Sequence, residues 1–442
     1  MKQAVWIILA LLAMASCQPG NPDYQQQAAN PEFLNRSMTR LTDNIIYDAL
    51  PPPVASRIYA YASIAGYEAL AAGNPDYQQL DGQLNGLEAS PKPEAGKEYC
   101  YPLASVHAFL TVGKALTFSE DSIAAFQQVL YGEFEALNMP EDVYERSMQY
   151  GEAVAKHILA WSGGDNYKQT RTFPKFSIND ELNRWQPTPP GYKEAIEPHW
   201  NKIRPFTLDS AAQYAPPPPT AFSSDKNSTF YKEAIEVYEA LNTPDKEERI
   251  AIAKFWDDNP FISHNVGHVM FATKKASPGG HWTGIVAIAA RKANADMMKT
   301  CEAYLYVALA MADGFISCWD EKYRSNLIRP ETYLNKYVDE DWLPLLQTPP
   351  FPEYTSGHSV ISSAIAVVLT HVFGDNFEYT DTTEEVIGLP PRTFKSFVAA
   401  SQEACISRLY GGIHYMPAIA NGAVQGQNVG KHVLDRVKVK KG

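Results

Sequence analysis

The sequence is poor in cysteine and in positive charge. Five of its 442 residues are Cys and none belongs to a Cys-x-x-Cys pair, so the four that follow Cys17 are expected to be buried as small apolar side chains. Lys and Arg total 38 against 50 Asp and Glu, which gives a net charge of -12, so no nucleic-acid partner is expected. An anion site in this chain must therefore be basic locally, against an acidic background.

Long apolar runs are confined to the N-terminus. No later run reaches the about 18 apolar residues that suggest a membrane-spanning helix, so the body of the protein is expected to be soluble. Residues 1–17, MKQAVWIILALLAMASC, combine an early Lys, an apolar stretch and small residues before Cys17, which is typical of a secretory signal. The end of this stretch resembles a bacterial lipobox, in which the signal is cut before the Cys and the Cys is lipidated.

The polar residues 18–31 are rich in Gln, Asn, Pro and Gly and are expected to form a tether. We therefore expect an exported protein of the bacterial cell envelope. It would be held at the membrane only by a lipid on Cys17 and would face the periplasm or the cell surface. The alternative is a plain secretory signal in which Cys17 has no role.

Strand signals are also scarce, since alternating runs are short and no Asn-Gly or Asp-Gly turn links two of them. Most of the chain instead carries apolar residues at three-to-four spacing, which predicts helices. The predicted helices are 55–73, 119–137, 141–164, 228–242, 243–258, 282–328, 360–374, 392–412 and 416–437. Residues 165–225 lack this periodicity and contain APPPPT, which predicts a long irregular crossover.

These patterns predict an all-α fold built of helical bundles. We expect an N-terminal helical region at 32–245, which includes the Pro-rich crossover, and a C-terminal helical bundle at 246–442.

The segment KYRSNLIRP, residues 322–330, places two cations seven residues apart. On a helix this spacing is almost two turns, so Lys322 and Arg329 are expected on one helix face. Pro330 disfavours helical geometry at the preceding residue, so the helix is expected to end there. Two cations at a helix end form either a solvated surface, which is the common case, or one wall of an anion site.

A second segment, PPFPEYTSGHSVISSAIAVVL at 349–369, predicts a turn followed by an apolar helix. Ser356, Gly357 and His358 then lie at the helix N-terminus, where free backbone N–H groups and the positive end of the dipole favour anions. Gly357 allows the backbone to approach a ligand closely. The alternative is an ordinary Ser N-cap followed by a surface histidine.

A third segment, SRLYGGIHYMPA at 407–418, ends a helix near Arg408 and breaks it at Gly411 and Gly412. His414 is then presented from a loop, which is unusual for a histidine of the core. Taken alone, such a segment more often has no functional role than a functional one.

Together the segments read Lys-x6-Arg-Pro, Ser-Gly-His and Ser-Arg-x5-His, in this order. The pattern resembles the superfamily shared by type 2 phosphatidic acid phosphatases, bacterial class A acid phosphatases and vanadium-dependent haloperoxidases. The resemblance covers roughly residues 250–430. It implies helical bundles like those of vanadium chloroperoxidase, with an oxyanion site in the C-terminal bundle.

The resemblance also implies a role for each matching residue. The ligands of the vanadate oxygens, or of phosphate in the same site, would be Lys322, Arg329, Ser356, Gly357 and Arg408. His414 would bond to the vanadium of vanadate, or attack phosphorus as a nucleophile. His358 would be the acid/base group on the opposite side.

Two aromatic residues favour the haloperoxidase branch of the superfamily. Trp319 stands three residues before Lys322, and Phe351 lies in FPEYTSGH, as in the fungal-type vanadium chloroperoxidase pattern, where the Phe flanks the halide. Both rings would line the halide or substrate pocket, with plain core packing as the alternative. The absence of several membrane helices disfavours the lipid phosphatases, and the chain is long for a class A acid phosphatase.

Two further segments resemble bacterial members of the same branch, FWDDNP at 255–260 and PGGHW at 278–282. The resemblance suggests that Asp257 or Asp258 orients Arg408 or a histidine from behind the site.

The chain departs from the family pattern at two positions. Thr355 replaces the usual Pro before Ser-Gly-His, which is a mild change. Ala418 stands four residues after His414, where the family has an Asp that orients the histidine. Another carboxylate or a backbone carbonyl would have to take its place.

The sequence thus favours a haloperoxidase-like enzyme with bound vanadate that uses hydrogen peroxide to oxidise a halide or a small organic substrate. The first alternative is a soluble acid phosphatase that acts on phosphomonoesters through a phosphohistidine. The second is a surface lipoprotein that binds an oxyanion without turnover, which the loss of the family carboxylate at Ala418 keeps open.

Overall fold

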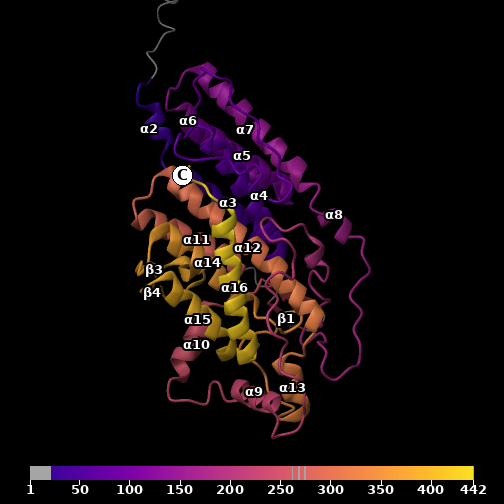
Figure 1. Ribbon diagram of the computed structural model, residues 1–442. Coiled ribbons are helices and arrows are strands. Elements are labelled where there is room, and N and C mark those ends of the chain that lie inside the picture. The colour runs from indigo at the N-terminus through magenta and orange to yellow at the C-terminus, as the bar shows by residue number, and fades with distance from the viewer. Residues whose placement is uncertain (1–20, 261, 267–268, 273–274, 442) are drawn as a thin grey trace, which may run out of the picture.

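The structure is a computed structural model that describes residues 21–260, 262–266, 269–272 and 275–441. The predicted signal sequence, Cys17 and residues 18–20 lie outside the described residues, so export and lipid anchoring stay predictions. The described chain is mainly helical, and its strands form two short antiparallel pairs, which confirms the all-α prediction. Figure 1 shows the N-terminal helices gathered at one end of the molecule and the C-terminal helices at the other.

The N-terminal helices form around α4, which is buried along its whole length and is mostly apolar, although Arg57 and Glu68 are buried in it too. Their bounds are α2 Tyr24–Ala28, α3 Glu32–Tyr47, α4 Pro52–Ala71, α5 Tyr101–Leu116, α6 Glu120–Glu135, α7 Glu141–Ser162 and α8 Tyr167–Thr170. Helices α3 and α5 have no counterpart among the predicted helices. Part of the predicted tether is helical too, since α2 buries Tyr24 and Ala28.

The predicted crossover is present as an irregular segment between α8 and α9, interrupted by one short helix, η1 at Trp200–Lys202. It runs down the outside of the molecule in Figure 1. A buried carboxylate fixes its middle, because Asp313 accepts hydrogen bonds from the backbone N–H groups of Phe206 and Thr207, each at 2.7 Å. The crossover is therefore tied to a core helix rather than loosely attached.

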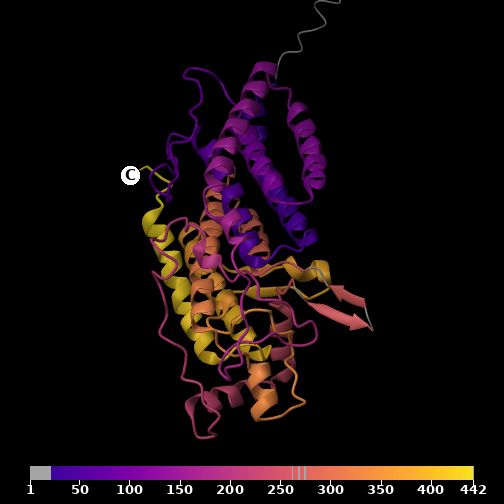
Figure 2. The ribbon, with the colours of Figure 1, turned by 90° about the vertical axis from the view of Figure 1, so that its right-hand side faces the viewer.

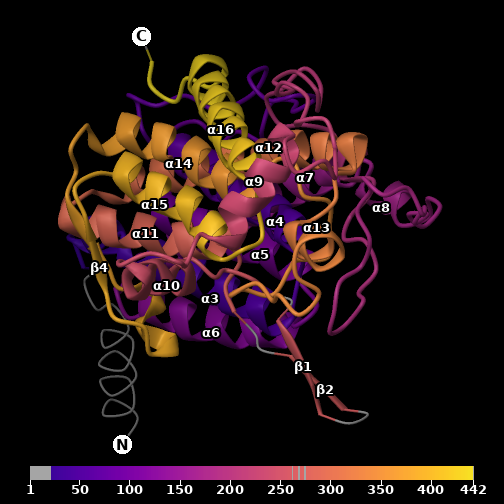
Figure 3. The ribbon, with the colours of Figure 1, turned by 90° about the horizontal axis from the view of Figure 1, so that it is seen from below.

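The C-terminal helices continue the chain with two β-hairpins between them. Their bounds are α9 Thr229–Tyr238, α10 Lys246–Phe255, β1 Ser263–Val266, β2 Val269–Ala272, α11 Pro278–Lys292, α12 Met297–Ser325, α13 Pro330–Tyr337, α14 Gly357–Phe373, β3 Tyr379–Asp381, η2 Thr383–Ile387, β4 Arg392–Phe394, α15 Phe397–Tyr410 and α16 Met416–Arg436. The β1–β2 hairpin projects from the body in Figures 2 and 3.

Two predicted helices are divided in the structure. The stretch predicted as one helix at 282–328 is two, because Asp296 caps a new helix by accepting a hydrogen bond from the Lys299 N–H. The predicted helix at 392–412 begins with β4, and its helical part starts only at Phe397, after the N-cap Ser396.

Helix α12 is the centre of the molecule. It packs against α4 of the N-terminal helices and against α14 and α16 of the C-terminal ones, and one continuous apolar core includes residues of both regions. By length and composition α12 is apolar enough to cross a membrane, but its apolar stretch is wholly buried in the protein. The four cysteines of the described chain are buried and free, as expected.

The packing of α14 against α16 depends on a glycine. A Cβ at Gly426 would lie 2.0 Å from the Val360 carbonyl oxygen, which is far inside van der Waals contact. We expect Gly426→Ala to lower the free energy of unfolding by about 1–3 kcal/mol or more. Urea unfolding of both proteins measures this difference.

A matched control is Gly132→Ala in α6, because a Cβ there would meet no atom within 4 Å. That change is expected to raise stability by about 0.5–1 kcal/mol, since Ala is the better helix former. Equal effects of the two substitutions would contradict the close approach of α14 and α16.

Candidate functional site

The two cations of KYRSNLIRP lie on different elements. Helix α12 ends at Ser325, with Asn326 in the left-handed conformation at φ 47°, and Arg329 has extended backbone as the N-cap of α13. The prediction of one helix face was therefore wrong, because the Asn326 turn ends the helix three residues before Arg329. Pro330 begins the next helix at its first position, where its fixed φ is favourable.

Lys322 nevertheless points into the protein and is fully buried. Its ammonium donates to the carbonyl oxygens of Pro352, Glu353 and Thr355, at 3.0, 3.1 and 2.5 Å. Burial lowers the pKa of Lys322 to about 8, so it is mostly charged at neutral pH. These three hydrogen bonds hold the loop before α14 around the Lys322 ammonium.

Arg329 is also fully buried and meets the same loop. Its Nε donates to the Phe351 carbonyl at 2.9 Å and its Nη1 to the Ile413 carbonyl at 2.8 Å. Burial lowers its pKa to about 10, which leaves the guanidinium charged. Its Nη2 has no hydrogen-bond partner among the described residues, so a buried donor is available there.

The N-terminus of α14 lies at the other side of these cations, as predicted. Ser356 is the N-cap and accepts from the Ser359 N–H, and its own N–H donates to the Ala418 carbonyl at 3.0 Å. The first N–H groups of the helix have no carbonyl partner inside it. A Cβ at Gly357 would meet only the Trp319 ring, at 3.7 Å, so the backbone is open on that side.

His414 follows the Gly411–Gly412 break between α15 and α16, where Gly412 has φ 77°. Its Nε2 lies 3.1 Å from Arg329 Nη1 and its Nδ1 lies 2.9 Å from Glu353 Oε1. Because a guanidinium only donates, Nε2 must accept and Nδ1 must carry the proton. Burial and the charges of Arg329 and Lys322 hold the pKa of His414 well below its ordinary value, so the ring is neutral.

Glu353 is the residue that the sequence analysis missed. Its fully buried carboxylate accepts from His414 Nδ1 and from the Tyr415 N–H, at 2.9 and 3.0 Å. It therefore takes the orienting position that Ala418 leaves empty. Burial raises the pKa of Glu353 to about 7, against the opposing effect of Arg329 and Lys322. The available signal was an acidic residue in an otherwise apolar FPEY turn.

Arg408 is the third buried cation and comes from the end of α15. Its Nη2 donates to the Trp256 carbonyl at 2.5 Å and its Nε to Ser407 Oγ at 2.9 Å. Burial lowers the pKa of Arg408, and the charges of Asp257 and Asp258 act in the opposite direction.

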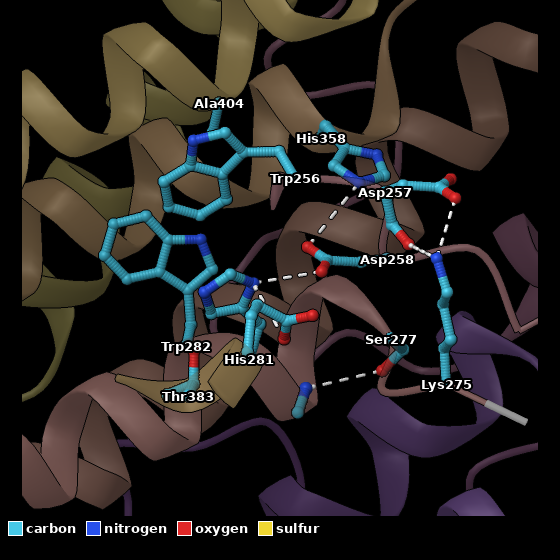
Figure 4. Close-up of polar contacts among 12 residues, drawn as sticks. Trp256, Asp257, Asp258, Lys275, Ser277, His281, Trp282, His358, Thr383 and Ala404 are labelled. Atoms are coloured by element: carbon cyan, nitrogen blue, oxygen red, sulfur yellow. Dashed lines mark hydrogen bonds and ion pairs between the residues drawn. The ribbon is translucent and has the colours of Figure 1, made fainter. Parts of the chain in front are cut away.

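The two predicted acidic residues behind the site have different partners. Asp257 pairs with Lys275 at 2.9 Å, and burial raises its pKa. Asp258 lies between two histidines, His281 at 2.9 Å and His358 at 3.7 Å, as Figure 4 shows. The sequence analysis did not single out His281.

His358 is the predicted acid/base residue and is partly exposed, with 15% of its side chain accessible. Burial of its ring nitrogens and the charge of Arg408 hold its pKa well below the ordinary value. The imidazole is therefore neutral in the anion-free site and free to take up a proton when negative charge arrives.

Some of these residues line one narrow cavity of about 30 Å³ that is partly open to solvent. Its polar lining includes Gly357, His358, Arg408 and His414, and its apolar lining includes Trp319 and Phe351. The two rings are 5.0 Å apart, and the Trp319 Nε1 donates to the Ile196 carbonyl of the crossover. The structure thus brings the three motifs and both predicted aromatics together.

The side chains fit a tetrahedral oxyanion. Lys322, Arg329 and Arg408 all lie close enough to His414 to act on its charge, and Arg329 Nη2 is a free donor. Glu353 lies close to Lys322 and Arg329, and Asp257 and Asp258 lie close to Arg408. An anion would satisfy the donor and offset the charge. A second cluster, Asp258, His281 and Glu384, has a metal-like arrangement, but its carboxylates would repel an oxyanion.

The tautomer of His414 can be tested directly. In oxyanion-free buffer at pH 8, above the pKa of about 7 of Glu353, we expect a neutral ring protonated at Nδ1 because the Glu353 carboxylate accepts there and Arg329 donates to Nε2. Long-range 1H–15N spectra of protein labelled at histidine measure this, and His414→Gln identifies the signal. A doubly protonated ring, or a proton on Nε2, would contradict the geometry.

Comparisons with known proteins agree with this site. The family model of the VCPO second helical-bundle domain matches residues 302–440. No curated protein matches the chain. The solved structure of a protein described as the first bacterial vanadium-dependent iodoperoxidase is 52% identical, with a TM-score of 0.89 over 94% of this chain and 98% of that one.

The holo and apo forms of a bacterial vanadium-dependent chloroperoxidase share the fold at 16% identity. Their TM-scores are 0.67 and 0.66 over 88% of this chain and 93% and 94% of theirs. The identity of more than half over nearly the full length of the iodoperoxidase decides the family, and the chain belongs to the vanadium-dependent haloperoxidases.

Proposed function

We propose that this protein binds vanadate in the cavity beside His414 and uses hydrogen peroxide to oxidise a halide, with iodide as the first candidate. The observation that carries the proposal is the neutral His414, whose unprotonated Nε2 accepts from Arg329, next to three buried cations. Such a set of residues binds an anion and offers one nitrogen ligand to its central atom.

The chain supplies each part of the binding site. His414 Nε2 would hold the vanadium, and Glu353 would keep the ring in the tautomer that this requires. The anionic oxygens would be held by Lys322, Arg329, Ser356, Gly357 and Arg408. Bound vanadate would supply the Lewis-acidic centre at which peroxide becomes an oxidant for halide.

His358 would move the protons of the reaction. It faces the cavity from the first turn of α14, and an anion beside it would favour its protonated form. It would accept a proton from peroxide and return it to the departing oxygen. Asp258, 3.7 Å away, would stabilise the protonated ring.

The apolar side of the cavity suits a weakly hydrated halide. Trp319, Phe351 and Phe315 line it with several prolines, so an anion that enters must lose water. Among the common halides iodide loses water and electrons most readily. The 52% identical relative is described as an iodoperoxidase, which supports the same preference here.

The proposed activity is tested with purified protein, hydrogen peroxide and iodide or bromide, with and without orthovanadate. We expect vanadate-dependent oxidation, faster with iodide, and its loss in His414→Ala because the vanadium ligand is removed. Thermal unfolding without vanadate shows whether that variant is folded. Absence of vanadate-dependent oxidation in the wild type would sink the proposal, and phosphomonoester hydrolysis that needs His414 would favour a phosphatase.

Glu353→Gln tests the carboxylate that replaces the family Asp. Gln keeps the shape but loses the charge that holds the Nδ1 proton of His414, so we expect vanadate affinity to fall about 10- to 100-fold. Isothermal titration of orthovanadate measures the affinity without requiring turnover.

Glu302→Gln is the matched control for this substitution. Glu302 is buried as Glu353 is, but it lies in the core helix α12 and bonds to Tyr77 rather than to the site. Equal vanadate affinity of Glu353→Gln and wild type would remove Glu353 from the proposed role.

A further inference from the structure

His281 forms the middle of a buried chain of ion pairs behind His358. Its Nδ1 lies 2.9 Å from Asp258 Oδ1 and its Nε2 lies 2.9 Å from Asp381 Oδ2. All three side chains are at most 2% exposed. Because a carboxylate oxygen only accepts, a ring with one carboxylate at each nitrogen is an imidazolium.

The ring of His281 is also fixed in place. It stacks on Trp256 with centroids 4.7 Å apart and an interplanar angle of 18°, and the edge of Phe255 lies at 5.5 Å. Its backbone belongs to the first turn of α11. The ring therefore stays between the two carboxylates. Their charges raise the pKa of His281 well above its ordinary value, although burial acts in the opposite direction.

In Asp258 and in Asp381, one carboxylate oxygen is bonded to His281 and the other faces a different group. Asp381 Oδ1 accepts from the N–H and the hydroxyl of Thr383, at 3.0 and 2.7 Å, which leaves Oδ2 for His281. Asp258 gives Oδ1 to His281, and its Oδ2 has no hydrogen-bond partner among the described residues. That oxygen lies 3.7 Å from His358 Nε2, which is also unbonded, as Figure 4 shows.

We propose that His281 is a positioning residue for the reaction: anchored by Asp381, it holds Asp258 so that its free oxygen faces the acid/base residue His358. This inference rests on the proposed function. When negative charge enters the cavity and His358 takes a proton, Nε2–H can donate to Asp258 Oδ2 after a small approach. The array of Asp381, His281 and Asp258 thus places a hydrogen-bond acceptor beside His358 before His358 is protonated.

The charges around the array set the direction of the effect. His358 is faced by Arg408 from α15, Lys322 from α12 and His281 from α11, which all disfavour its protonation, and by Asp258, which favours it. Without His281, the buried carboxylate of Asp258 loses the cation bonded to it and keeps only the more distant Arg408, which favours uptake of a proton. His358 then loses its anionic partner, so its pKa falls further.

The experiment compares vanadate-loaded wild type with His281→Gln and with Asp381→Asn, which keeps its shape. We expect kcat for iodide oxidation to fall about 10- to 100-fold in both, as for other residues that orient a catalytic group. KM for iodide and the affinity for orthovanadate stay unchanged. The limb of the kcat–pH profile that reports His358 moves to lower pH.

Glu384→Gln is the control. Glu384 lies 3.7 Å from His281 Nδ1 and is not hydrogen-bonded to the array of Asp381, His281 and Asp258. Burial raises the pKa of Glu384 to about 7, so at pH 6 Gln replaces a largely protonated carboxyl. We expect its kcat to equal that of the wild type. A purely structural role for His281 would lower vanadate affinity and melting temperature in step with kcat, and that result would overturn the proposal.

Crystal structures of the two variants test the array independently of turnover. We expect Asp258 turned away from His358 in both. An unchanged Asp258 would overturn the inference even in an active enzyme, whereas an inactive wild type with a displaced Asp258 in the variants would refute only the proposed function.

Discussion

Burial of three cations around one small volume is the constraint on which the rest of this site depends. Lys322, Arg329 and Arg408 are each at most 1% exposed. Glu353 lies close to the first two, and Asp257 and Asp258 lie close to Arg408. Backbone carbonyls satisfy most of the donors of the three cations, and these carbonyls come from loops that have no regular structure. The loop before α14 thus takes a shape in which its carbonyls bond to the buried cations. The remaining positive potential would be neutralised by a bound oxyanion.

The charged groups around the site give three histidines different protonation states. His414 and His358 face cations and lose their protons, whereas His281, between two carboxylates, keeps both. In the proposed function, neutrality would suit His414 as a ligand and His358 as a base, and the charge of His281 would make it a fixed counter-ion. Environment, rather than residue type, separates the three roles.

The sequence predicted the helical class because apolar periodicity is a local property. That the three motifs meet was implied by their resemblance to a known superfamily. The end of α12 was misplaced because the left-handed Asn326 turn leaves no proline or glycine signal. Glu353 was missed because His414, its partner, lies 61 residues further along the chain. His281 was missed because Asp381, one of its two partners, lies 100 residues away on another element. The vacancy at Ala418 did indicate that some carboxylate was needed, but only packing could show which one.

The position of α12 bears on how this protein can be divided. The helix spans Met297–Ser325, and the family match begins at residue 302, inside it. That same helix carries Asp313, which anchors the crossover, and Lys322, which organises the site, while one side of it completes the N-terminal core. A fragment that begins at residue 302 would lack the first turn of α12 and would also lack α4, which packs against α12. The catalytic half is therefore a unit of sequence comparison but not an autonomous unit of folding.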